Sequence, residues 1–384
     1  MSRTRVDTPP TGATMPTTVL VTGATGWLGR HTLDALAGHS GLRVIAAARD
    51  ASRVPPAHTA QARIGDLTDP TYRHTVVQGV DVLIHAGTWS SFWGHASHER
   101  SLFLEPSIDL IDRAVEAGVG RIVLASTIAI GTPARAGATV AAADAPVARG
   151  YWPHLDAMVA VEQHARGAAG TGPGSTTVVS ARLGHFVGPG LSLGLVSALV
   201  PRLRTRMVPW VDRGSARMPL IDGTDLGRAM ALAALAPGIE GYVPIPIVGA
   251  EQPTSREAIS HIAELANVPR PVYSVPTRAA FGFAALMERL HPVLPGTSPF
   301  LTRALVHVGL DWHSDPATAR ELLGFEARVD WRDAVAASVA DRRALGFPWP
   351  ELTQRPTQPL DWVSAPQLPS GRPSPSVHTR RSTS

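Results

Sequence analysis

The chain has 384 residues, 44% hydrophobic and 17% charged, a composition typical of a soluble globular protein with a full hydrophobic core. It contains no cysteine, which excludes disulfides and thiolate metal sites, and all 35 residues counted as Lys plus Arg are arginines. The net charge is only +4, and neither 201–217 nor the terminal HTRRSTS resembles a nucleic-acid-binding module, so we expect no nucleic-acid partner.

The ends of the chain differ from its body. Residues 1–16 and 349–384 are rich in Pro, Ser, Thr and Arg and lack hydrophobic periodicity, which predicts disordered tails around a folded region at 17–348. No apolar run approaches the roughly 20 residues needed to span a bilayer, and the N-terminal region has no apolar run typical of a secretory signal. We therefore expect a cytoplasmic protein with no membrane partner.

Short apolar runs alternate with helical patterns in the first half of the chain. The runs are TVLVTG, RVIAAAR, ARIGD, DVLIHAG, RIVLAST and TTVVSARLG. Continuous apolar strands separated by helices predict an α/β fold, a doubly wound parallel sheet covered on both faces. We expect this dinucleotide-binding domain at 17–185, with 218–236 packing back on it and a smaller, less regular substrate-binding lobe at 186–348.

The second half still contains one clear helix start. In 253–265, Thr254 and Glu257 have capping-box spacing.

A glycine-rich turn follows the first expected strand. Gly23, Gly26 and Gly29 stand between that strand and the opening of a helix, together with Thr25, Trp27 and Leu28. Glycines at this spacing let the backbone approach a pyrophosphate that lies on the positive end of the helix. A tight strand-to-helix turn without a ligand is the alternative.

Residues after the next strands indicate which dinucleotide binds. Arg49 follows the second strand, where a protein that prefers NAD usually has an acid, and a guanidinium suits a 2′-phosphate. Arg30 could join it. The arginines therefore favour NADP, with NAD as the alternative, although both could be solvated surface residues. Adenine and ribose are expected near the ends of strands three and four, at Asp66, Leu67, Ala86 and Gly87.

The order of these motifs resembles one enzyme family. The glycine turn, GDLTD, HAG, LASTIAIG, RLGHFVGPG (182–190), MPLIDGTDLGRAM (218–230) and ELLGFEARVDWRDAV (321–335) follow one another as in extended short-chain dehydrogenases/reductases. The chain resembles the NAD(P)-dependent epimerase/dehydratase group, near the 3β-hydroxysteroid dehydrogenase and dihydroflavonol reductase branch. This resemblance covers nearly all of 18–348 and implies a Rossmann fold and, because such enzymes often dimerise through helices, a homodimer.

The resemblance also implies a catalytic Tyr-x-x-x-Lys pair and a Ser or Thr that binds the substrate carbonyl. The hydroxyl is present, with Thr127 the first candidate and Ser126 the second. The pair is broken: Glu162 resembles the acid four residues after the family's Lys, which puts Met158 at the Lys position, near the nicotinamide, and His154 at the Tyr position.

An alternative register places Tyr151 at the Tyr position and Leu155 at the Lys position, and Phe103 stands where the family often has Asn. No lysine elsewhere can restore the pair. An imidazole with a pKa near 6.5 can transfer protons at neutral pH without an ammonium, so His154 could replace the Tyr. It could equally be an ordinary histidine at a helix start, and Tyr151 could act as the proton donor.

Other residues bear on the substrate. Several aromatic side chains are expected near the carboxyl ends of the strands and suggest an apolar small-molecule substrate: Trp89, Phe92, Trp93, Trp152 and Phe186. Five arginines could hold an anionic substrate group such as a carboxylate or a phosphate, although a solvated basic face is the simpler explanation: Arg202, Arg204, Arg206, Arg213 and Arg217. The histidine spacings match no ligand pattern, so we expect no metal.

Three functions remain open from the sequence. The first is an NADP-dependent oxidoreductase that acts on the carbonyl or hydroxyl carbon of a small, largely apolar substrate with an altered proton relay. The second is a lyase, isomerase or cyclase that retains the fold. The third is a non-catalytic NADP-binding protein.

Overall fold

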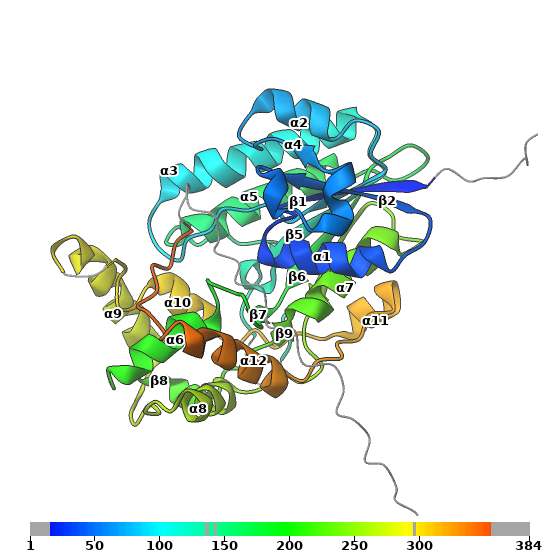
Figure 1. Ribbon diagram of the computed structural model, residues 1–384. Helices are drawn as coiled ribbons and strands as arrows, with labels where there is room; N and C mark the ends of the chain where they lie inside the picture. Colours follow the sequence, from blue (N-terminus) through cyan, green and yellow to red (C-terminus); the bar gives the residue numbers. More distant parts are fainter. Residues whose placement is uncertain (1–15, 135–137, 142–143, 295–296, 355–384) are drawn as a thin grey trace, which may run out of the picture.

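The computed structural model describes residues 16–354, except 135–137, 142–143 and 295–296. Seven strands form one parallel sheet in the order β10-β6-β5-β4-β1-β2-β3 (Figure 1). The strands are β1 (Thr17–Thr22), β2 (Leu42–Ala48), β3 (Arg63–Ile64), β4 (Val82–His85), β5 (Arg121–Thr127), β6 (Thr177–Leu183) and β10 (Tyr242–Ile247). The order reverses beside β1, as in doubly wound sheets, and confirms the predicted fold class.

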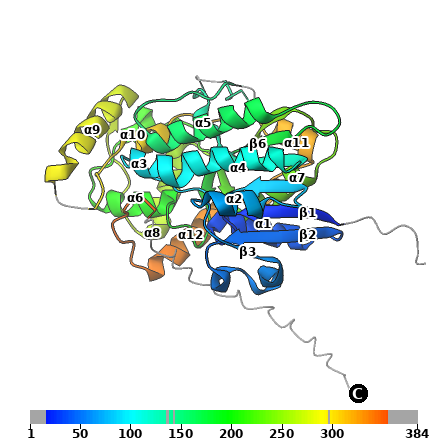
Figure 2. The same cartoon turned by 90° about the horizontal axis from the view of Figure 1, so that it is seen from above.

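Helices cover both faces of the sheet (Figures 1 and 2). One layer contains α1 (Trp27–Ala37), α7 (Gly223–Leu235) and α11 (Ala317–Leu323), and the other contains α2 (Pro70–Val76), α4 (Glu105–Glu116) and α5 (Pro153–Ala168). Consecutive residues of β1 supply both cores, because Val19 and Val21 pack in the first layer and Leu20 in the second. Burial on both faces explains why the strands read as unbroken apolar runs.

Several further helices form a second lobe at one end of the sheet (Figure 1). They are α6 (Leu195–Arg204), α8 (Ser255–Ala266), α9 (Thr277–Leu290), α10 (Arg303–Val308) and α12 (Trp331–Ala344). The predicted capping box of α8 is confirmed: Thr254 Oγ1 accepts the Glu257 amide, and the Glu257 carboxylate accepts the Thr254 amide. Two short parallel pairs, β7 (His185–Val187) with β9 (Leu220–Asp222) and β8 (Trp210–Val211) with β11 (Ser274–Val275), link the segments of this lobe.

Segments beyond residue 185, the expected boundary between the dinucleotide-binding domain and the substrate-binding lobe, return to the sheet and its helices. The segment 218–236 contributes α7, which packs against α1, but the sheet also takes its edge strand β10 from beyond that segment. A short helix, α3 (Ala96–Glu99), continues through a π-helical stretch, Arg100–Leu104, into α4. No helix in the described part of the chain is long and apolar enough to cross a membrane.

The sequence predicts a C-terminal tail from residue 349, but the structure shows that the folded region continues to residue 354. Residues 349–354 are packed: the Phe92 amide donates to the Leu352 carbonyl at 2.8 Å, the Gln354 amide donates to the Ser90 carbonyl at 3.0 Å, and Leu352 is buried. Two-residue contacts of this kind give no periodic signal in the sequence. The remaining tail, 355–384, and residues 1–15 lie outside the described residues.

The contact between α1 and α7 generates the first prediction. A Cβ on Gly227 would lie 2.1 Å from the His31 carbonyl oxygen, whereas a Cβ on Gly282 in α9 would meet nothing within 4 Å. Gly227→Ala must push the two helices apart and should lower the free energy of unfolding by about 1 to 3 kcal/mol. Gly282→Ala should be neutral or stabilise the protein by up to about 1 kcal/mol, because alanine favours the helix. Urea unfolding measures both, and equal effects would contradict the prediction.

Candidate active site

A cavity of about 1740 Å³ runs from the glycine turn of β1–α1 into the second lobe. The carboxyl ends of β1, β2, β4, β5 and β6 supply one part of its lining, and α5, α6, α9, α10 and 348–354 are among the segments that supply the rest. In open parallel sheets, ligands bind at these strand ends, where the strand order reverses.

The glycine turn has the shape of a phosphate-binding site. Gly23 has φ of +64°, and a Cβ there would lie 2.6 Å from Gly87 Cα. A Cβ on Gly29 would lie 2.1 Å from the Gly23 carbonyl oxygen. The start of α1 at Gly26 receives no side-chain cap, so the first amides of the helix have no side-chain partner at this end. Backbone amides and the helix dipole at this position suit a pyrophosphate. Thr25, Trp27 and Leu28 also line the cavity here.

Two arginines line the cavity beyond β2. They are Arg49, which is exposed, and Arg53, which the sequence analysis did not single out although it stands only four residues later. Arg30 does not line the cavity, because its guanidinium donates to the Thr25 and Arg53 carbonyls. The neighbouring acid, Asp50, accepts the Ser52 amide and hydroxyl and lies outside the cavity lining.

The expected adenine and ribose positions also line the cavity: Asp66, Leu67, Ala86 and Gly87. Beneath them, His85 bonds Thr22 through Nδ1 at 2.7 Å and Ser107 through Nε2 at 2.9 Å. Burial lowers the pKa of His85 to about 4, so the ring is neutral at neutral pH. The Thr22 hydroxyl also accepts the Gly87 amide at 3.3 Å, which links this buried chain to the cavity wall.

The two candidate hydroxyls at the end of β5 have different partners. Ser126 donates to Glu162 Oε2 at 2.5 Å and is buried. Thr127 is half-buried, and its Oγ1 accepts the Ala129 amide at 3.2 Å. The Thr127 proton therefore stays available for a ligand oxygen, whereas that of Ser126 is already used.

Glu162 holds α5 over the sheet. Its buried carboxylate accepts from Ser126 on β5, Ser180 and Arg182 on β6 and Tyr242 on β10, at distances between 2.5 and 3.0 Å. Burial and the adjacent carboxylate raise the pKa of Tyr242, so this phenol remains a donor. One side chain of α5 is thus bonded to three neighbouring strands.

His154, in the first turn of α5, lines the cavity. Its Nδ1 lies 3.0 Å from Glu99 Oε2, while Glu99 Oε1 accepts the Ser91 amide at 2.9 Å. Only 2% of the Glu99 side chain is exposed. With Nδ1 on Glu99, Nε2 is the ring atom that remains for a ligand. Met158 lies one turn later in the cavity wall, and the Phe103 ring centroid is 5.6 Å from that of His154.

Tyr151 lies elsewhere. It does not line the cavity, and its hydroxyl is 2.7 Å from His307 Nδ1. His307 Nε2 donates to the Ala129 carbonyl, so Nδ1 accepts and Tyr151 donates. Burial lowers the pKa of His307 to about 4 and raises that of Tyr151, which keeps the proton on the phenol.

The predicted substrate residues divide into two groups. Trp89, Phe92, Trp152 and Phe186 line the cavity, whereas Trp93 and Arg217 do not. Trp93 packs against His95 and His291, and Arg217 is exposed and donates to the Gln252 carbonyl. The described residues contain no group of three His, Asp or Glu side chains able to hold a metal ion.

Two contacts near the cavity escaped the sequence analysis for a physical reason. Glu99 lies 55 positions before His154, and Gln354 lies far beyond Ser90, so no local pattern connects either pair. Only the folded chain brings them together.

Known proteins resemble this chain in sequence or in fold. A 2-alkyl-3-oxoalkanoate reductase from Stenotrophomonas maltophilia (strain K279a) is 28% identical over 303 residues, which cover 75% of this chain and 87% of that protein. MoeE5, solved with UDP-glucuronic acid and NAD, has a TM-score of 0.63 at 22% identity, over 85% of this chain and 99% of its own. The UDP-glucose 4-epimerase of Thermus thermophilus, solved with NAD, has a TM-score of 0.60 at 20% identity, over 85% and 99%.

At these identities the two solved structures establish a shared fold only. The sequence pattern goes further, since the model of the NAD dependent epimerase/dehydratase family matches residues 19–241. With the glycine turn, the strand order and the placement of the cavity all in agreement, the chain belongs to the NAD dependent epimerase/dehydratase family.

Proposed function

We propose that this protein is an NADP-dependent oxidoreductase acting on the carbonyl or hydroxyl carbon of a small, largely apolar substrate. The observation that carries the proposal is that Thr127 and His154, each with a group left for a ligand, line the same cavity as the glycine turn. The relative named as a 2-alkyl-3-oxoalkanoate reductase supports a carbonyl reduction. The aromatic lining supports an apolar substrate.

The residues present fit a dinucleotide. The uncapped start of α1 would hold the pyrophosphate, Asp66, Leu67, Ala86 and Gly87 would surround adenine and ribose, and Arg49 with Arg53 would bind a 2′-phosphate. The Asp50 carboxylate caps the turn that follows it by accepting the Ser52 amide. It therefore does not place a negative charge where Arg49 and Arg53 would bind the 2′-phosphate. When bound, the nicotinamide supplies hydride transfer.

Proton handling falls to Thr127 and His154. The Thr127 hydroxyl donates a hydrogen bond to the substrate oxygen, which polarises a carbonyl and orients it. His154 Nε2 gives a proton to that oxygen in reduction and removes one in oxidation. Glu99 holds Nδ1 and orients the ring, and an imidazole transfers protons at neutral pH without the lysine that a phenol requires.

The role of Thr127 predicts a pair of variants. Thr127→Val removes the hydroxyl donor at nearly constant volume and should lower kcat/KM by about 100-fold, whereas Thr127→Ser should keep most of it. Steady-state NADPH oxidation with a panel of apolar ketones and 3-oxo acids measures both. Wild-type activity in Thr127→Val would remove Thr127 from the site.

The role of His154 predicts a second pair. His154→Gln should lower kcat by about 100-fold or more and flatten the pH profile, because the acid–base group is lost. Tyr151→Phe should change kcat little, since Tyr151 donates to His307 outside the cavity lining. The opposite ranking of the two variants would transfer proton handling to Tyr151.

The arginines predict cofactor preference. Arg49→Gln should weaken NADPH binding about tenfold and leave NADH binding unchanged, because one charge-assisted contact to the 2′-phosphate is lost. Arg43→Gln is the matched control, since Arg43 is exposed at the opposite end of the same strand. Calorimetric titration with both nucleotides measures the effect, and equal losses for NADPH and NADH would contradict the assignment.

A further inference from the structure

The part of the cavity inside the second lobe is largely apolar, and the charged residues in its lining are Arg202, Asp341, Arg342 and Glu351. Its walls come from α6, α9, α10 and the 348–354 segment, and include Leu199, Ala280, Phe283, Met287, Leu305 and Leu352. Arg202, near the end of α6, lines the same region and is only 4% exposed.

Among the described residues, the guanidinium of Arg202 has only neutral partners. It donates to the carbonyls of Phe300 at 2.6 Å, Pro299 at 3.1 Å and Ala198 at 2.6 Å. The Trp349 ring centroid lies 4.8 Å from its Cζ. These bonds use three of the five N–H groups of an arginine, which leaves two without a partner among the described residues.

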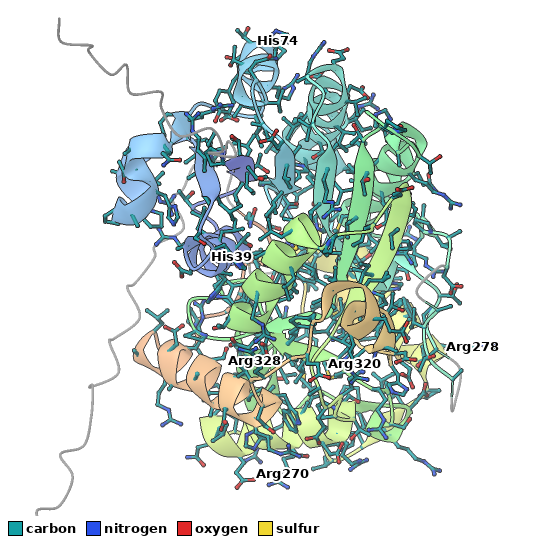
Figure 3. All side chains as sticks on the ribbon, turned by 90° about the vertical axis from the view of Figure 1, so that its right-hand side faces the viewer. His39, His74, Arg270, Arg278, Arg320 and Arg328 are labelled. Atoms are coloured by element: carbon teal, nitrogen blue, oxygen red, sulfur yellow. The ribbon has the colours of Figure 1, made fainter. Side chains whose placement is uncertain are left out.

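No carboxylate in the described part of the chain forms an ion pair with Arg202, and burial, with no acidic side chain opposing it, lowers the pKa of Arg202 to about 10. The guanidinium therefore carries a charge at neutral pH inside a largely apolar wall. Other arginines of this protein behave differently: Arg270, Arg278, Arg320 and Arg328 lie at the outer surface (Figure 3). Buried charges are normally paired, because removal from water costs several kcal/mol. An anionic ligand would supply the missing partner.

We propose that this part of the cavity binds the hydrocarbon chain of a carboxylic acid, with its carboxylate on the two remaining N–H groups of Arg202. The inference deepens the proposed function, on which it rests, by naming the substrate class as an apolar carboxylic acid. The two remaining N–H groups of the Arg202 guanidinium match the two oxygens of a singly charged carboxylate.

The rim of the cavity suits the entry of such a chain. Met207, Tyr273 and Phe283 are 55%, 45% and 46% exposed, and all three also line the cavity. Apolar side chains that are shared between the surface and the interior give a hydrocarbon chain a continuous path.

Binding of a redox-inert acid tests the proposal without turnover. Quenching of tryptophan fluorescence in the full-length protein, to which Trp349 beside Arg202 contributes, would be titrated with decanoate and with decan-1-ol. The wild type should bind decanoate at least tenfold more tightly than the alcohol, because a charge-assisted bond is worth more than a neutral one. Arg202→Gln should abolish that preference and leave the affinity for the alcohol nearly unchanged.

Arg204→Gln is the matched control: Arg204 lies two residues later on α6, is exposed and does not line the cavity. It should bind both ligands as the wild type does. Should Arg202→Gln fail to fold, the wild-type ratio decides alone. Equal affinity for acid and alcohol in the wild type, or an undiminished preference in a folded Arg202→Gln, would overturn the proposal. These titrations need neither NADP nor catalysis, so they stand apart from the turnover assays that test the proposed function.

Discussion

Helix α5 keeps its place because the Glu162 carboxylate is bonded to three strands at once. A buried carboxylate is costly unless its oxygens are satisfied, and here Ser126, Ser180, Arg182 and Tyr242 all donate to it. The helix therefore cannot slide or rotate over β5, β6 and β10 without breaking several short hydrogen bonds. The same helix presents His154 and Met158 to the cavity, so the position of the proposed acid–base group depends on Glu162, two turns away.

The arrangement also divides work between adjacent hydroxyls. Ser126 donates to Glu162 on α5, whereas the Thr127 hydroxyl keeps its proton for a ligand in the cavity. The two neighbours differ because side chains alternate in direction along a strand. A second carboxylate, Glu99, lies 3.0 Å from His154 Nδ1, and in the proposed reaction it would orient the ring whose Nε2 transfers the proton. An imidazole needs no depressed pKa for this task, which makes the loss of both the Tyr and the Lys a single chemical change rather than two independent losses.

The sequence predicted most of what depends on local pattern. All six strand runs of the first half lie in the sheet, and the glycine turn lies at the strand-to-helix junction, because periodicity and glycine geometry are properties of neighbouring residues. It could not predict the Glu99–His154 contact, the bond of Tyr151 to His307, or the packing of 349–354 on Ser90 and Phe92, because these join distant residues. It also could not separate cavity arginines from surface ones. Arg49, Arg202 and Arg217 look alike in the sequence, and only burial and bonding distinguish them.

Two buried charges, Glu162 and Arg202, illustrate how a structural role differs from a ligand-binding one. Glu162 is buried, accepts hydrogen bonds from one arginine and three hydroxyl groups, and takes no part in the proposed reaction. Arg202 is almost as buried, yet in the part of the chain that the structure describes its charge meets only carbonyl dipoles and one indole ring. Dipoles orient a guanidinium without neutralising it, so the free energy of desolvation is offset only in part. The proposed anion site therefore depends on a guanidinium whose donors are held in place by its carbonyl partners, rather than on a flexible side chain at the surface.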